Sequence, residues 1–182
     1  MSIVNIKGLN VSENSYRRAR KIVEEKRNNR DEKTEKTADD VLASIREMKP
    51  GWTIGTEPNH NWQAGARNIE ISQNVLERMA EDPEAMVKFK ALILDLEDLV
   101  PAIEEWMENN EGQSLEFKFS LEDAGTTRAV ALVRGLMGGE VRSTFELPSN
   151  SERSWADLIR EKLDSMNSGQ SEDEFGNKYW QA

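Results

Sequence analysis

The sequence lacks cysteine altogether and contains a single histidine, His60. Without cysteine there are no disulfides, thiolate nucleophiles, iron–sulfur clusters or cysteine-ligated zinc sites. One histidine excludes a metal site built on two histidines of one chain. We therefore expect no metal ligand set and no cofactor. No run of about eighteen apolar residues occurs, so no membrane-spanning helix is expected.

The N-terminal stretch Met1–Gly8 has no apolar signal region. This predicts a cytoplasmic protein, and it leaves open export by a route that needs no signal peptide.

Positive charge is also scarce, since 24 Lys and Arg residues face 34 Asp and Glu residues and the net charge is -10. Such an acidic chain repels phosphate backbones, which makes nucleic acid an unfavourable partner. The exception is the basic run at residues 17–30, which contains Arg17, Arg18, Arg20, Lys21, Lys26, Arg27 and Arg30. We predict an N-terminal arm over residues 1–35, capped by Ser12 and helical or partly disordered, because its apolar stripe is narrow.

Helix start signals recur further along the chain. Thr37 precedes two acids and can cap a helix that Pro50-Gly51 ends. Short strands are expected at 52–55 and 68–71, with the loop 56–65 between them. Ser72 can cap a short helix that continues to Asp82-Pro83.

The longest periodic stretch runs from Asp82 to Asn109. Its apolar residues follow the i, i+3, i+4, i+7 spacing of one helix face, and Pro101 should kink or divide the helix. The other face is predicted to be acidic and solvated, with a docking role for the basic arm or a partner. That face consists of Glu84, Asp95, Asp98, Glu105 and Glu108.

The apolar period changes to two after Asn109. Alternating runs at 115–121, 127–136 and 141–147 are separated by glycine-containing turns. We predict an α+β fold in which this antiparallel three-stranded meander, extended by the upstream strands to four or five, is covered by the long kinked helix and by a C-terminal helix around Trp155–Leu163. This pattern predicts three parts of the chain: the arm at 1–35, one domain at 36–166 and a polar, aromatic tail at 167–182.

The segment Ile69–Glu84 resembles the motif I-S-P-N-x-L-x-x-M-A-N-D-P-E of an uncharacterised family of small proteins from anaerobic Firmicutes, a domain of unknown function. Gln73 stands where that family often has proline, and Glu81 where it often has asparagine. The resemblance extends over residues 38–147. It implies a bacterial origin and no known catalytic residues.

No catalytic constellation is predicted. His60 lies in a polar loop without a second histidine or a cysteine nearby, and the acidic helix face has no calcium-loop spacing. The sequence therefore leans away from an enzyme. A small enzyme that uses carboxylates or a cation, with His60 nearby, stays as one alternative, and nucleic-acid binding through residues 17–30 as another.

The leading hypothesis is a non-enzymatic interaction or adaptor protein that binds a protein partner or associates with itself. Charged and aromatic residues outside the predicted core carry this hypothesis. The candidate partner-binding residues are Arg17, Arg18, Arg20, Lys21, Trp62, Tyr179 and Trp180.

Overall fold

The fold comes from a computed structural model that describes residues 2–6, 9–28, 37–56, 65–109, 113–121, 127–135, 140–146, 170–172 and 178–180, with the single positions 157, 161 and 164. Beyond Asn109, side chains are described only at those single positions, so strands there are described by their backbone. Within the predicted C-terminal helix only Asp157 and Glu161 are described, and both are helical and exposed, whereas the loop with His60 and Trp62 lies outside the described residues.

The chain opens with a β-hairpin that leads into a helix. Strand β1 (Ile3–Ile6) pairs antiparallel with β2 (Leu9–Ser12), and α1 (Glu13–Asn28) follows at once. The Ser12 hydroxyl accepts from the backbone N–H of Ser15 at 3.2 Å, which confirms Ser12 as the cap. Ala19 and Val23 are buried, and α1 packs against the long helix of the same chain.

Helices α2 to α5 begin where the local signals predict. Thr37 caps α2 (Ala38–Met48), and Ser72 caps α3 (Gln73–Glu81). Asp82 caps α4 (Pro83–Glu97), with Pro83 in the first turn, where its missing N–H costs nothing. The predicted long helix divides at 98–99, and α5 (Val100–Asn109) starts just before Pro101.

The main sheet has the strand order β3-β4-β5-β6-β7. Strands β5 (Gln113–Leu121), β6 (Thr127–Gly135) and β7 (Glu140–Glu146) pair antiparallel in chain order. Strands β3 (Thr53–Gly55) and β4 (Gly65–Ile71) join them in parallel, with Ile54 opposite Ile69 and Ile69 opposite Phe119. A separate two-stranded sheet pairs β8 (Gln170–Glu172) with β9 (Lys178–Trp180).

The fold is thus mixed α and β, as predicted, and β5, β6 and β7 pair antiparallel in chain order. The two added strands β3 and β4 join in parallel, so the five-stranded sheet as a whole is not an antiparallel meander. The chain leaves β4, passes through α3, α4 and α5, and returns as β5 in the same direction. A crossover of this length makes parallel pairing possible, whereas the short turns after β5 and β6 require antiparallel pairing. Local periodicity does not reveal the direction in which a strand enters a sheet.

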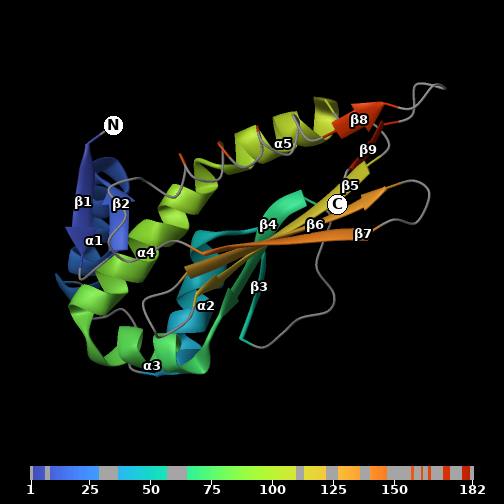
Figure 1. The fold of residues 1–182 in the computed structure, drawn as a ribbon. Coiled ribbons are helices and arrows are strands. Elements are labelled where there is room, and N and C mark those ends of the chain that lie inside the picture. The colour runs from blue at the N-terminus through green and yellow to red at the C-terminus, as the bar shows by residue number, and fades with distance from the viewer. Residues whose placement is uncertain are drawn as a thin grey trace.

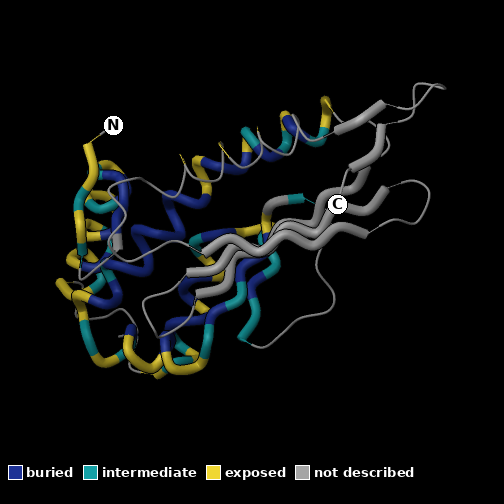
Figure 2. The backbone as a smooth tube through the Cα atoms, viewed as in Figure 1, coloured by how far each residue is buried: buried dark blue, intermediate teal, exposed yellow. Residues whose placement is uncertain are grey.

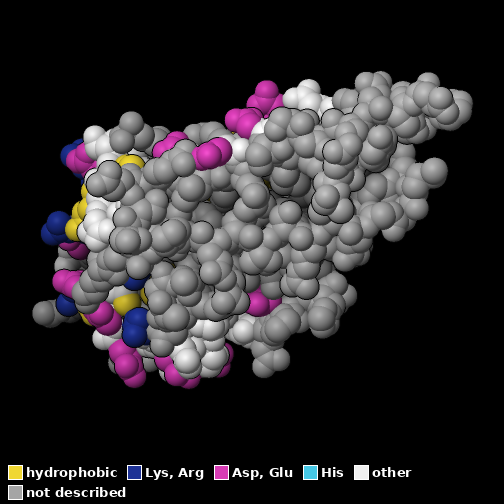
Figure 3. All heavy atoms as spheres, viewed as in Figure 1, with side chains coloured by type: hydrophobic (Ala, Val, Ile, Leu, Met, Phe, Trp, Pro, Cys, Tyr) yellow, Lys and Arg dark blue, Asp and Glu magenta, His cyan; other side chains and the backbone are white. Residues whose placement is uncertain are grey.

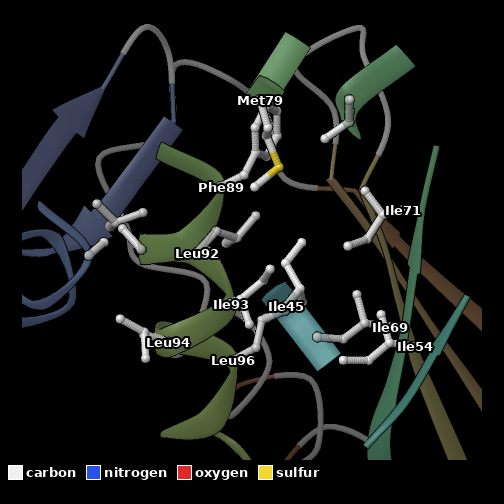
Figure 4. Close-up of a cluster of buried hydrophobic side chains, with 14 of the residues drawn as sticks. Ile45, Ile54, Ile69, Ile71, Met79, Phe89, Leu92, Ile93, Leu94 and Leu96 are labelled. Atoms are coloured by element: carbon white, nitrogen blue, oxygen red, sulfur yellow. The ribbon is translucent and has the colours of Figure 1, made fainter. Parts of the chain in front are cut away.

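The long helix does not simply cover the sheet, and this corrects the prediction. Helix α5 packs against β4 and β5, whereas α4 packs against α1, α3 and β2 (Figure 1). Helix α4 is buried along almost its whole length (Figure 2). Figure 4 shows Ile45 of α2 between the Leu92, Ile93 and Leu96 side chains of α4 and the isoleucines of β3 and β4. Helix α4 is therefore the centre of the helical layer.

The predicted acidic face is wrong at Asp95, which is 7% exposed. Residues 85–96 contain only three polar side chains, Lys88, Lys90 and Asp95, and all three are buried. A helix that is apolar on every side belongs inside a protein. The composition of residues 85–96 already indicates a buried helix, whereas the spacing of the apolar residues on one face does not.

Candidate functional site

The exposed side of α1 holds the four predicted partner-binding cations of the arm. Arg17 pairs with Glu13, Arg20 with Glu24 and Lys21 with Glu25, each one helical turn apart. Arg18 instead points towards α4, where its guanidinium lies 3.6 Å from the Glu97 carboxylate. Exposed pairs of this kind contribute little to stability, but they balance the charge of the arm locally. Two further basic residues, Lys26 and Arg27, lie in the last turn of the helix.

A groove lies where the end of α1 meets the end of α3 and the start of α4. It has a volume of about 130 Å³ and an apolar lining from Val23, Met79, Ala80, Pro83 and Met86. Lys26 and Arg27 are the charged residues among the described part of its lining. In Figure 3, hydrophobic side chains lie beside basic ones at the end of the molecule that α1 and α3 form. The groove thus combines an apolar floor with two cationic groups.

Lys26 is held in place by a polar cluster beneath it. Its Nζ donates to the Ser44 hydroxyl of α2 at 3.3 Å, and the fully buried Lys90 of α4 donates to the same oxygen at 3.0 Å. The cluster therefore connects α1, α2 and α4, which positions the cationic rim of the groove.

Two lysines around one serine suggest a nucleophile, but the geometry does not favour one. A serine nucleophile needs a base that accepts its proton, whereas both lysines donate to Ser44. Ser44 is 7% exposed, lies inside α2 and does not line the groove. The cluster is best understood as structural.

A second polar cluster anchors the N-terminal hairpin to α4. Both oxygens of the buried Asp95 carboxylate accept hydrogen bonds from Ser12, one from its backbone N–H at 2.8 Å and one from its hydroxyl at 2.6 Å. Asp95 thus holds the residue at which β2 ends and α1 begins. It fixes the direction in which α1 leaves the hairpin, and so the position of the groove at the other end of α1.

Two neighbouring acids at the end of α4 have pKa values shifted in opposite directions. The hydrogen bond from Lys49 holds the pKa of Glu97 below its ordinary value of 4.5. Burial raises the pKa of Asp98 above its ordinary value of 3.8, and the nearby Asp95 carboxylate adds to the effect. Ionised Glu97 therefore stabilises the fold, and ionised Asp98 destabilises it.

These shifts predict opposite effects of two similar substitutions at pH 7. Glu97→Gln should lower the free energy of unfolding by less than about 1 kcal/mol, because the Lys49–Glu97 pair is partly exposed. Asp98→Asn should raise the free energy of unfolding by a smaller amount than Glu97→Gln lowers it. Glu97 stops contributing as the pH falls below 4.5 and through its lowered pKa. Both differences from the wild type should therefore shrink at about pH 3. Urea unfolding at the two pH values measures this, and shifts of equal sign at pH 7 would contradict it.

The described residues say little about the remaining sequence predictions. Tyr179 and Trp180 lie in β9, opposite Ser171 and Gln170, with only their backbone described. Within the described residues, no group of three or more His, Asp or Glu side chains could hold a metal ion. None of the described helices is both long enough and apolar enough to cross a membrane.

The groove residues Lys26 and Arg27 belong to the predicted basic run but not to the predicted site. Sequence reasoning selected the first turns of the arm, where the basic residues are densest. Counting the acids one turn away would have shown that Glu13, Glu24 and Glu25 balance those turns. Most of the apolar lining of the groove comes from α3 and α4, more than fifty residues away in the chain, and no local pattern links it to the arm.

Comparison with known proteins gives one match. The model of a family described as "Protein of unknown function (DUF6033)" matches residues 56–153, which is more than half of the chain. No curated protein and no solved structure matches the chain. The matched residues begin later than the resemblance drawn from Ile69–Glu84 suggested, at 56 rather than 38, and they extend to 153. They include the α3 and α4 side of the groove but not α1.

Proposed function

The chain belongs to the DUF6033 family of proteins of unknown function, and on that premise we propose that it is a non-catalytic module that binds a protein partner. The observation that carries the proposal is the groove between α1, α3 and α4. Apolar recesses with a charged rim are a common form of peptide and protein contact site, in which one anchor side chain fills the recess and polar contacts orient it.

The groove is composite, which supports a binding role specific to this chain. Met79, Ala80, Pro83 and Met86 lie within the residues that match the family, whereas Val23, Lys26 and Arg27 lie before them. The family core thus supplies most of the apolar lining, and the N-terminal helix supplies both charges. We propose that α1 determines which partner chemistry the groove accepts.

The alternatives gain no support from the described residues. Cation-dependent chemistry needs several ligands that converge on one ion, and the described residues contain no such group. His60 lies outside the described residues. Nucleic-acid binding needs a continuous basic surface, but three of the four candidate cations on α1 pair with acids of the same helix. The proposed second contact segment is the C-terminal hairpin, on the sequence evidence of Tyr179 and Trp180.

Charge reversal at the groove tests the proposal. Tagged wild type and an Arg27→Glu variant are purified from cells that express the chain naturally, and the retained proteins are compared quantitatively. Arg20→Glu is the matched control, because it makes the same change on the same helix two turns away and does not line the groove. We expect Arg27→Glu to reduce retention of a specific partner by at least about tenfold, equivalent to about 1.4 kcal/mol, and Arg20→Glu to preserve it.

Circular dichroism of the three purified proteins verifies that they are equally folded. A partner that all three proteins retain equally would show that the groove is not the contact site. Absence of any specific partner for the wild type would argue against the binding role itself.

A further inference from the structure

The groove has room for one aromatic ring. Its volume of about 130 Å³ is close to that of an engineered apolar cavity of about 150 Å³ that accepts benzene. Val23, Met79 and Met86, which form part of its lining, are all less than 9% exposed, so these walls are firmly packed. An anchor of this size is a phenylalanine side chain rather than an extended apolar face.

The exposed Arg27 gives the groove a cationic rim, which favours an acidic ligand. Both charged residues of the described lining, Lys26 and Arg27, are on the α1 side, and none of the described lining residues is acidic. Charge-assisted bonds from Lys or Arg to a carboxylate are stronger than those between neutral groups, and arginine can bind a carboxylate through two nitrogens. A ligand that brings carboxylates next to one aromatic ring therefore matches both parts of the groove.

The chain itself contains a segment with that chemistry. Glu172, Asp173 and Glu174 form the only run of three consecutive acids in the sequence, and Phe175 follows directly. This segment begins at the end of β8 and belongs to the connection between β8 and β9. Three carboxylates beside one phenylalanine match the two cations and the ring-sized recess.

The groove and this hairpin lie at opposite ends of the molecule. In Figure 1, β8 and β9 lie beyond the far end of α5, whereas α1, α3 and the start of α4 form the other end. Segments separated in projection are also separated in space. A second copy can therefore bring its hairpin to the groove, but the hairpin of the same copy cannot reach it from this position.

We infer that the groove binds the segment Glu172–Phe175 of a second copy of the chain, with Phe175 in the recess and the acids against Lys26 and Arg27. This inference rests on the proposed function and names the partner of its site. Because groove and segment are different surfaces, the contact is heterologous, and repeated contacts close into a ring or continue as an open chain.

Light scattering over a range of protein concentrations tests the inference on the full chain. We expect the wild type to gain mass with concentration, while Arg27→Glu and Phe175→Ala stay monomeric at concentrations at least about tenfold higher. Arg20→Glu should associate like the wild type. A chain that carries Arg27→Glu together with Glu172→Lys and Glu174→Lys should regain association, because the charges on both sides of every contact are then reversed and attract again.

A labelled peptide of residues 169–181 provides a second measurement. Its fluorescence anisotropy should rise on binding to the Phe175→Ala protein, whose own segment competes less, and binding should weaken at least about tenfold with the added Arg27→Glu change. A wild type that stays monomeric overturns the inference, even where its own segment occupies the groove of the same copy. Association that Phe175→Ala leaves unchanged overturns it as well.

The proposed function can survive that failure. If Arg27→Glu still abolishes retention of another protein, the groove binds a different partner and only the inference fails. If Arg27→Glu changes neither self-association nor partner retention, both fail.

Discussion

Replacing Leu92 by alanine is expected to lower the free energy of unfolding by about 2–5 kcal/mol. Leu92 is fully buried in α4, in the cluster that joins α4 to α2, β3 and β4 (Figure 4). Truncation loses the transfer free energy of the removed carbons and leaves a cavity that neighbours on several elements cannot fill together. Urea unfolding followed by circular dichroism measures the loss.

Val87→Ala is the appropriate comparison, since Val87 lies on the same helix and is only partly buried. It should cost well under half as much as Leu92→Ala, because fewer apolar contacts are lost. Equal costs for the two substitutions would mean that α4 is not the centre of the helical layer.

Asp95→Ala is expected to destabilise the fold by about 3 kcal/mol, because two buried donors lose their acceptor. The substitution leaves the backbone N–H and the hydroxyl of Ser12, both bonded to the carboxylate, without that acceptor in a buried position. An orphaned buried donor costs about 1–3 kcal/mol. Ser12→Ala should cost less, because Asp95 still accepts the backbone N–H, although α1 loses its cap.

Hydrogen exchange separates this anchoring role from a general loss of stability. In Asp95→Ala the amides of β1 and β2 should exchange faster by a larger factor than those of α4, because the hairpin loses its connection to the core. A uniform increase across the chain would contradict the anchoring role. A loosened hairpin should also weaken binding in the groove. Helix α1 begins directly after Ser12, the residue that Asp95 holds, and α1 forms one side of the groove.

Local chemistry made much of the helical part predictable. Thr37, Ser72 and Asp82 cap helices because a side-chain oxygen can satisfy the N–H groups of the first turn, whatever surrounds the helix. Pro101 lies within the first turn of α5, where a residue needs no N–H to donate to a preceding turn. These signals act over a few residues and are readable from the chain.

The candidate site was less predictable, because each of its parts depends on residues far away in the sequence. The bond from Lys90 to Ser44 spans 46 residues, and those from Ser12 to Asp95 span 83. The basic run placed the predicted contact in the first turns of α1, where Arg17, Arg20 and Lys21 pair with acids on the same helix, and that contact stays a prediction.

The sequence by itself determined where the helices begin and end, because capping, proline geometry and apolar period are short-range effects. Only the tertiary structure decided that α4 is enclosed on nearly all sides, that β3 and β4 enter the sheet in parallel, and that the end of α1 meets α3 and α4. Those outcomes depend on how separate elements pack together. Burial of apolar surface rewards many pairings, and only the packing of the whole chain selects among them.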